Sequence, residues 1–133
     1  MTTASERAFV IADLAGYTAL TEAHGGMEAA KTVSRYVELA SQALVPGARL
    51  LENVGDQVLI VADDVRAAVQ TALRLRDAVE REPLFPDVRI GIHAGPVVEQ
   101  AGHYFGSALN VTARLAAHAR AGEVLCTERI AAG

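Results

Sequence analysis

The chain has 133 residues, of which 51% are hydrophobic and 21% are charged, so it is predicted to fold as one domain with a substantial core. Its net charge of −4 comes without a cluster of basic side chains, which argues against binding to nucleic acid or to an anionic membrane surface. No stretch of about 18 apolar residues could span a bilayer. The polar residues 1–7 lack the apolar core of a signal peptide, and a cytoplasmic protein is therefore expected.

The first predicted element is a buried strand that carries one carboxylate near its end. Residues 9–14, Phe-Val-Ile-Ala-Asp-Leu, are apolar apart from Asp13. An ionised carboxylate is costly to bury unless a cation or hydrogen-bond donors compensate it. Asp13 is therefore a candidate metal ligand, and the alternative is that it caps a helix that begins at residues 16–18.

Glycine, proline and the spacing of apolar residues divide the rest of the chain into short elements. Helices are predicted over residues 17–24, 27–44, 63–81 and 106–119. Strands are predicted over residues 48–53, 57–62, 88–95, 96–100 and 123–127, and a further element begins at Thr127. The order β-α-α-β-β-α-β-β-α-β predicts an α+β fold with a ferredoxin-like core, in which helices pack on one face of a mainly antiparallel sheet.

Several common functional motifs are absent from the sequence. It contains no Walker A pattern, no G-x-G-x-x-G after a strand and no G-x-S-x-G elbow, which weakens Rossmann and hydrolase interpretations. The four histidines lack the spacing of a zinc site. The single cysteine, Cys126, lies in an apolar stretch and is predicted to be a small buried hydrophobe rather than a reactive thiol.

Two carboxylates beside glycines form the strongest candidate site. Asp13 lies near the end of the first strand, and Asp56 lies in the turn between two later strands. Neighbouring strands could bring both to one edge of the sheet. Paired oxygen ligands without Cys or His suit Mg²⁺ or Mn²⁺ in phosphoryl chemistry.

Asn110 and Arg114 form a second candidate pair on the last predicted helix. Residues four positions apart project side by side from one helix face. An amide and a guanidinium aimed together suit a ribose and a phosphate. The alternative for this pair is an ordinary solvent-exposed polar face.

Four sequence blocks in order resemble the catalytic domain of class III adenylyl and guanylyl cyclases. They are F-V-I-A-D-L-A-G-Y-T at 9–18, E-N-V-G-D at 52–56, R-I-G-I-H-A-G at 89–95 and F-G-S-A-L-N-V-T-A-R at 105–114. The resemblance extends from about Arg7 to Ile130, which is nearly the whole chain. It implies one cyclase homology domain over residues 1–133.

The resemblance also implies a reaction and a role for each matching residue. The expected protein is a homodimer with nucleotide sites in its interface, two ions of Mg²⁺ or Mn²⁺, and conversion of a purine nucleoside triphosphate to a 3′,5′-cyclic nucleotide and pyrophosphate. The implied roles are metal binding by Asp13 and Asp56, contact with the triphosphate by the turn Gly16-Tyr17-Thr18, contact with the terminal phosphates by Arg89, orientation of the ribose by Asn110, and stabilisation of the transition state by Arg114.

Two departures from the family pattern concern the base and the triphosphate. Adenylyl enzymes read the purine with a Lys and an Asp, and those positions are Glu52 and His103 here. A glutamate at the first position is typical of guanylyl enzymes and leans towards GTP. The family's C-terminal hairpin, with its triphosphate-binding lysine, is not found before Gly133, and Lys31 is the only lysine. The sequence is therefore either a truncated piece or a domain that binds its triphosphate less tightly.

Two functions remain open on the sequence alone. The first is an active nucleotidyl cyclase that uses GTP or ATP. The second is a cyclase-like regulatory or dimerisation module with weak or no catalysis.

Overall fold

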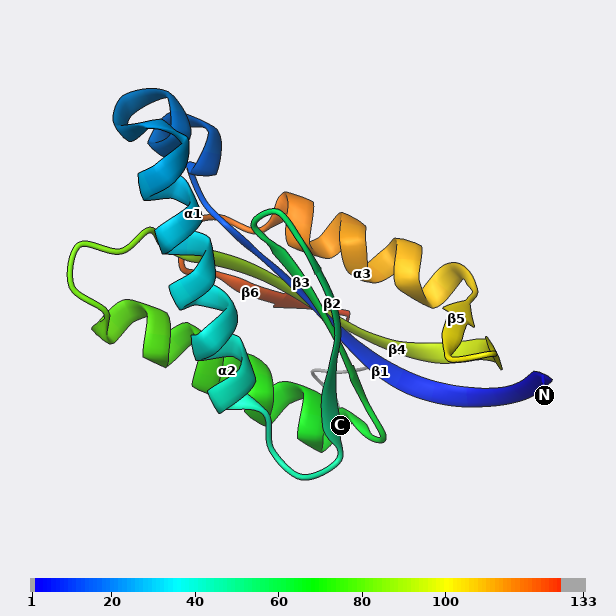
Figure 1. The fold of residues 1–133 in the computed structure, drawn as a ribbon. Coiled ribbons are helices and arrows are strands. Elements are labelled where there is room, and N and C mark those ends of the chain that lie inside the picture. Colours follow the sequence, from blue (N-terminus) through cyan, green and yellow to red (C-terminus); the bar gives the residue numbers. More distant parts are fainter. Residues whose placement is uncertain (1, 128–133) are drawn as a thin grey trace.

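The computed structural model describes residues 2–127, with the side chains of residues 2–4 and 20 excepted. Along the chain the elements are β1 (Thr2–Leu14), α1 (Tyr17–Ala43), β2 (Ala48–Val54), β3 (Gln57–Ala62), α2 (Val65–Arg81), β4 (Val88–Gln100), β5 (His103–Phe105), α3 (Ser107–His118) and β6 (Val124–Cys126), as Figure 1 shows. The further element predicted from Thr127 falls on residues outside this description.

One mixed sheet forms the centre of the fold. Its strand order is β2-β3-β1-β4-β5, and β6 pairs with β4. Every pairing is antiparallel except that of β4 with β6. β1 lies in the middle, with residues 8–13 paired to β3 and residues 2–14 paired to β4. The predictions of an α+β fold and a mainly antiparallel sheet are confirmed.

The main hydrophobic core lies between one face of the sheet and the helices α1 and α2. Successive strand residues point to opposite faces, and the even-numbered residues of β1, such as Val10 and Ala12, face this core. Tyr36 of α1 and Leu75 of α2 are fully buried against them. At the start of α2, Asp64 accepts a hydrogen bond from the Ala67 backbone N–H at 2.8 Å, as expected of a residue that begins a helix.

Helix α3 packs on the opposite face, so the prediction that all helices share one face is wrong. A second core cluster joins Phe9 of β1, Val61 of β3 and Ala108 of α3. Figure 1 shows α3 across the sheet from α1 and α2. Gly91 of β4 makes this packing possible, because a Cβ atom there would lie 2.5 Å from the backbone nitrogen of Ala116 in α3. Apolar spacing identified the buried side of the helix but not the face of the sheet that it covers.

Several local predictions also differ from the structure. β1 begins at Thr2 rather than Phe9, and β5 was not predicted. The helices predicted over 17–24 and 27–44 form one element, α1, which is interrupted at Gly25 (φ 82°, ψ 170°). The two strands predicted over 88–100 are the single strand β4. Cys126 is exposed rather than buried, since it lies at the end of β6, a three-residue strand that is paired with β4 alone.

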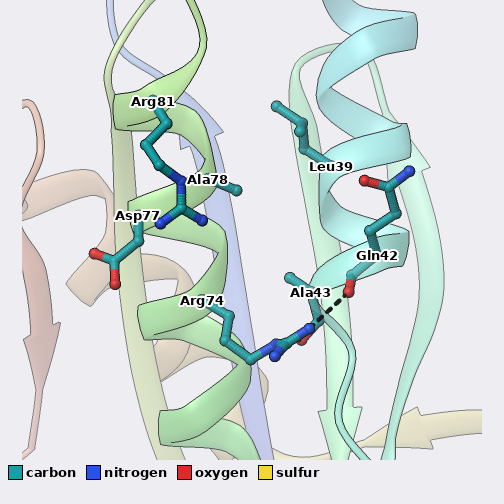
Figure 2. Close-up of a pocket in the computed structure, with 7 residues that line it drawn as sticks. All are labelled: Leu39, Gln42, Ala43, Arg74, Asp77, Ala78 and Arg81. Atoms are coloured by element: carbon teal, nitrogen blue, oxygen red, sulfur yellow. Dashed lines mark hydrogen bonds between the residues drawn. The ribbon is translucent and has the colours of Figure 1, made fainter.

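An arginine fastens the end of α1 to α2. Arg74 of α2 donates hydrogen bonds from Nε to the carbonyl oxygen of Ala43 (3.0 Å) and from Nη2 to that of Gln42 (3.1 Å), at the edge of a pocket of about 360 Å³ (Figure 2). The last turn of α1 has no basic residue of its own. Arg74 therefore supplies the positive charge that stabilises a helix C-terminus. In the described part of the chain, no helix is both long enough and apolar enough to cross a membrane.

The close approach of α3 to β4 generates a prediction for Gly91→Ala. The added methyl group must displace the backbone of α3, whose Thr112 carbonyl oxygen would lie 2.6 Å away. We expect the free energy of unfolding to fall by about 1–3 kcal/mol in chemical denaturation. Gly26→Ala is the matched control, because nothing lies within 4 Å of a Cβ there. Equal stability of Gly91→Ala and the unmodified chain would contradict this packing.

Candidate active site

The candidate site is centred on an ion pair at the end of the central strand. Asp13 of β1 lies directly opposite Arg89 in the β1–β4 pairing. Arg89 Nε donates a hydrogen bond to Asp13 Oδ1 at 2.9 Å. The side chains are 17% exposed for Asp13 and 35% exposed for Arg89. The sequence suggested Arg89 as a phosphate contact, but this bond to Asp13 was not predicted.

The charge of Arg89 does not fully compensate the burial of Asp13. Burial disfavours the ionised carboxylate and raises the pKa of Asp13, whereas the hydrogen bond and charge of Arg89 act in the opposite direction. The nearby charge of Asp56 raises the pKa further. The net upward shift means that Arg89 offsets only part of the cost of burying the ionised carboxylate.

Asp56 reaches the same region through the turn between β2 and β3. Val54 and Gln57 pair on the two sides of this turn, and Gln57 is also the β3 partner of Asp13. Gly55 adopts a positive φ of 56°, which tightens the turn. The side chain of Asp56 is partly buried. The fold thus brings the two candidate metal ligands to one end of the sheet.

A buried tyrosine lies within the electrostatic reach of both aspartates. Tyr36 of α1 is fully buried, and its hydroxyl has no hydrogen-bond partner among the described residues. Burial, followed by the charges of Asp13 and Asp56, raises the pKa of Tyr36 well above its usual range. In the sequence Tyr36 is one apolar-face residue of a long helix, so no pattern marked it.

These side chains fit a hard divalent cation. The described residues include no group of three or more His, Cys, Asp or Glu that could enclose a metal. Two carboxylates with room for water and phosphate oxygens are the usual protein contribution to a Mg²⁺ site in phosphoryl chemistry. Because Arg89 offsets only part of the burial of Asp13, a bound cation would further stabilise its ionised form.

The turn after β1 leaves the start of α1 without a side-chain cap. The cap residue is Gly16, with φ 75° and ψ 19°, and it makes no side-chain hydrogen bond. Asp13 is bonded to Arg89 instead, so the alternative that Asp13 caps this helix receives no support. Tyr17 is partly buried and Thr18 is exposed. Free backbone N–H groups at a helix start are suited to a phosphate group.

A pocket on the α3 side of the sheet contains both candidate base-reading residues. Its volume is about 310 Å³, and its lining consists of Leu51, Glu52, Leu59, Gly102, His103, Tyr104, Phe105 and Leu109. We call it the base pocket. Glu52 comes from β2 and His103 from β5, and both side chains are exposed.

Glu52 faces the base pocket because of an irregularity in β2. The pairing with β3 shifts between Leu50, which lies opposite Ile60, and Glu52, which lies opposite Leu59. Such a bulge changes the alternation of side chains by one residue. Without it, Glu52 would share the face of Leu50 and point towards α1 and α2.

Asn110 and Arg114 both lie exposed on α3, one helical turn apart. Leu109, the neighbour of Asn110, lines the base pocket. No hydrogen bond or ion pair within residues 2–127 joins Asn110 or Arg114 to Asp13 or Asp56. The acidic pair and the α3 pair are thus two sets of candidate residues that no described hydrogen bond or ion pair connects.

Comparison with known proteins gives a consistent set of relatives. The family described as adenylate and guanylate cyclase catalytic domain matches residues 2–132. A pH-sensitive adenylate cyclase of Mycobacterium tuberculosis is 34% identical over 119 residues, which are 90% of this chain and 30% of that protein. An adenylate cyclase of Streptomyces coelicolor is 37% identical over 106 residues, which are 78% of this chain and 28% of that protein. The chain thus spans under a third of the length of these relatives.

Solved structures with the same fold come from the same group of enzymes. The adenylate/guanylate cyclase/hydrolase of Silicibacter pomeroyi superposes with a TM-score of 0.86 at 28% identity, covering 98% of this chain and 80% of that one. The adenylyl cyclase CyaB of P. aeruginosa superposes with a TM-score of 0.85 at 20% identity, covering 99% and 81%.

The unbalanced charge of Asp13 generates a prediction for Asp13→Asn in metal-free protein. Because the folded-state pKa is raised above the ordinary 3.8, protonated Asp13 favours folding, and this contribution is lost as the pH rises through the raised value. Asn cannot ionise, so we expect Asp13→Asn to raise the Tm at pH 7 relative to the unmodified chain.

The expected advantage shrinks in melts at pH 4, because a carboxylate with a raised pKa is increasingly protonated as the pH falls. Thermal melts in the presence of a chelator at both pH values measure the effect. Asp87→Asn, an equal charge change at an exposed position, is the control. A lower Tm at pH 7 would show instead that Arg89 more than compensates the burial of Asp13.

Proposed function

The chain belongs to the adenylate and guanylate cyclase catalytic-domain family, and on this premise we propose that it forms a 3′,5′-cyclic nucleotide and pyrophosphate from a purine nucleoside triphosphate. The observation that carries the proposal is the placement of Asp13 and Asp56 at one end of the sheet, where Arg89 offsets only part of the cost of burying Asp13. An ion pair with a purely structural role would consist of Asp13 and Arg89 alone, one carboxylate and one arginine. A second acidic side chain nearby raises the cost of the site unless a cation is bound.

The proposed reaction is an in-line displacement within one nucleotide. The ribose 3′-oxygen attacks the α-phosphorus, the bond from that phosphorus to the bridging oxygen breaks, and pyrophosphate leaves. The proton of the 3′-hydroxyl passes to solvent. Divalent ions held by Asp13 and Asp56 would supply the positive charge that makes the 3′-oxygen a better nucleophile and offsets the charge of the triphosphate.

The side chains and backbone of the protein position the nucleotide. The uncapped start of α1, at residues 16–18, offers N–H groups to the triphosphate. When the nucleotide binds, Arg89 releases its hydrogen bond to Asp13 and contacts the terminal phosphates. Asn110 orients the ribose, and Arg114 stabilises the negative charge on the oxygens of the α-phosphate in the transition state.

We further propose that the complete site forms between two copies of the chain. Asp13 and Asp56 belong to one protomer, while Glu52, His103, Asn110 and Arg114 face them from its partner. This arrangement is compatible with the described residues, in which no hydrogen bond or ion pair joins the two sets within one chain. A symmetric dimer then contains two equivalent sites.

For the base, we propose that GTP is used at least as well as ATP. The Glu52 carboxylate accepts hydrogen bonds, as the guanine N1–H and exocyclic amine require. The relatives named above are adenylate cyclases, so ATP is the substrate to compare. One such contact corresponds to a modest preference, of about 10-fold.

A cyclase-like regulatory module is the second candidate. It is favoured by the hydrogen bond that already engages Asp13 with Arg89, and by the replacement of both residues that read adenine in adenylyl enzymes. Such a module dimerises and holds a nucleotide without turning it over. The enzyme assay below separates the two candidates.

The first test is formation of cyclic nucleotide from ATP and from GTP in Mn²⁺, measured by chromatography. We expect turnover by the unmodified chain and background activity from Asp56→Ala, which removes a metal ligand while leaving the fold intact. Asp87→Ala is the matched control and should keep full activity, because Asp87 is exposed. Undiminished activity of Asp56→Ala would refute the metal assignment, and absence of product from the unmodified chain would favour the regulatory module.

The second test is complementation between Asp13→Ala and Arg114→Ala chains, each inactive alone. In a mixed dimer one site carries both changes and the other carries neither. Random pairing makes half of the dimers mixed, and each has one intact site of two, so we expect recovery of about a quarter of the unmodified activity. Co-purification of differently tagged chains verifies subunit exchange. If exchange occurs without recovery, the site is not shared between protomers.

A further inference from the structure

The strands β2 and β5, which both supply residues to the base pocket, are joined by a hydrogen bond between two side chains. Arg49 of β2 donates from Nη2 to the hydroxyl of Tyr104 in β5 at 2.7 Å. These strands lie at opposite ends of the order β2-β3-β1-β4-β5. The bond therefore crosses the face of the sheet rather than following its pairing.

Tyr104 is held on a second side by aromatic packing. Its ring meets that of Phe9 edge to face, with centroids 5.7 Å apart and an interplanar angle of 77°. Phe9 is fully buried on the central strand β1. The phenol is thus supported by Phe9 at its ring and by Arg49 at its oxygen, and it lines the base pocket.

The side of the base pocket that β5 forms is held by few other contacts. β5 has three residues, pairs with β4 through residues 98–100, and follows a turn in which Ala101 and Gly102 both have positive φ. Phe105, at its end, is 55% exposed. Among the described residues, the hydrogen bond of Arg49 with Tyr104 joins β2 to β5 beside the pocket.

The same hydrogen bond connects the neighbourhoods of both base-reading candidates. Arg49 precedes Glu52 by three positions, and the bulge places both on the α3 face, opposite Val61 and Leu59 of β3. Tyr104 directly follows His103. A change in the Arg49–Tyr104 distance would therefore alter the spacing between Glu52 and His103.

We propose that Arg49 is a positioning residue for purine recognition, which acts by holding Tyr104 and so fixing the width of the base pocket. This inference rests on the proposed function, since it assumes that a purine occupies the pocket. Arg49 contacts neither the acidic side chains nor Asn110 and Arg114 among its described hydrogen bonds and ion pairs. Its loss should therefore weaken nucleotide binding while leaving the chemical step nearly unchanged.

The test compares variants that break the bond from either side. Arg49→Met removes the donor and keeps an unbranched apolar stem, and Tyr104→Phe removes the acceptor and keeps the ring on Phe9. The probes are 3′-deoxyguanosine triphosphate and 3′-deoxyadenosine triphosphate, which cannot cyclise because they lack the attacking hydroxyl. We expect either variant to raise the Kd for the better probe about three- to tenfold, and the double variant to be no worse than a single one.

Two further measurements separate positioning from general structural damage. Inorganic tripolyphosphate carries no base, so its Kd should stay unchanged in both variants. In turnover assays KM should rise with the Kd while kcat stays within about twofold. Arg49→Lys, which retains a donor, should recover part of the affinity.

Three outcomes would overturn the inference. Unchanged probe affinity in Arg49→Met and Tyr104→Phe would show that the bond does not shape the pocket. Additive losses in the double variant, or equal weakening of tripolyphosphate, would show that the two residues act separately or through the fold. Failure of the unmodified chain to bind either probe or tripolyphosphate would refute the proposed function itself and this inference with it.

Discussion

The candidate site depends on a partly buried carboxylate at the end of the central strand. Asp13 occupies the middle of the sheet, between β3 and β4, where desolvation disfavours charge. Arg89, directly opposite, offsets part of this cost and remains partly exposed. Without the nucleotide, such an arginine would serve as the counter-ion of Asp13, and with the nucleotide bound it would contact phosphate. Occupancy of the cation site would then be linked to occupancy of the triphosphate site. The empty protein would keep its acidic residues partly neutralised.

The two faces of the sheet have different tasks. The face covered by α1 and α2 contains most of the large buried side chains and accounts for most of the stability expected from apolar burial. The other face contains a small core cluster, the close contact between α3 and Gly91, and the base pocket. Because the groups proposed for recognition project from this second face, they can differ without disturbing the larger core.

The sequence was sufficient for the element types and for the neighbourhood of the site, because both follow from short-range patterns. Apolar spacing and glycines located most of the strands and helices, although β1 begins at Thr2 rather than Phe9 and β5 was missed, and carboxylates near glycines marked Asp13 and Asp56. Long-range geometry could not be obtained in this way. The face chosen by α3 depends on a missing side chain at Gly91, and the orphan hydroxyl of Tyr36 depends on packing between elements. The bonds of Arg89 to Asp13 and of Arg49 to Tyr104 join residues 76 and 55 positions apart, which no local pattern can pair.

The bulge in β2 has a consequence for how proteins of this kind can diverge. It turns Glu52 from the crowded side of the sheet to an exposed position, where a change of residue type meets water instead of packed neighbours. Exposed substitutions usually alter stability by less than about 0.5 kcal/mol. Since Glu52 is the residue proposed to read the base, a lineage could pass through several residues at position 52 without any intermediate that fails to fold. The same freedom does not extend to Asp13, where each substitution changes the cost of burying charge.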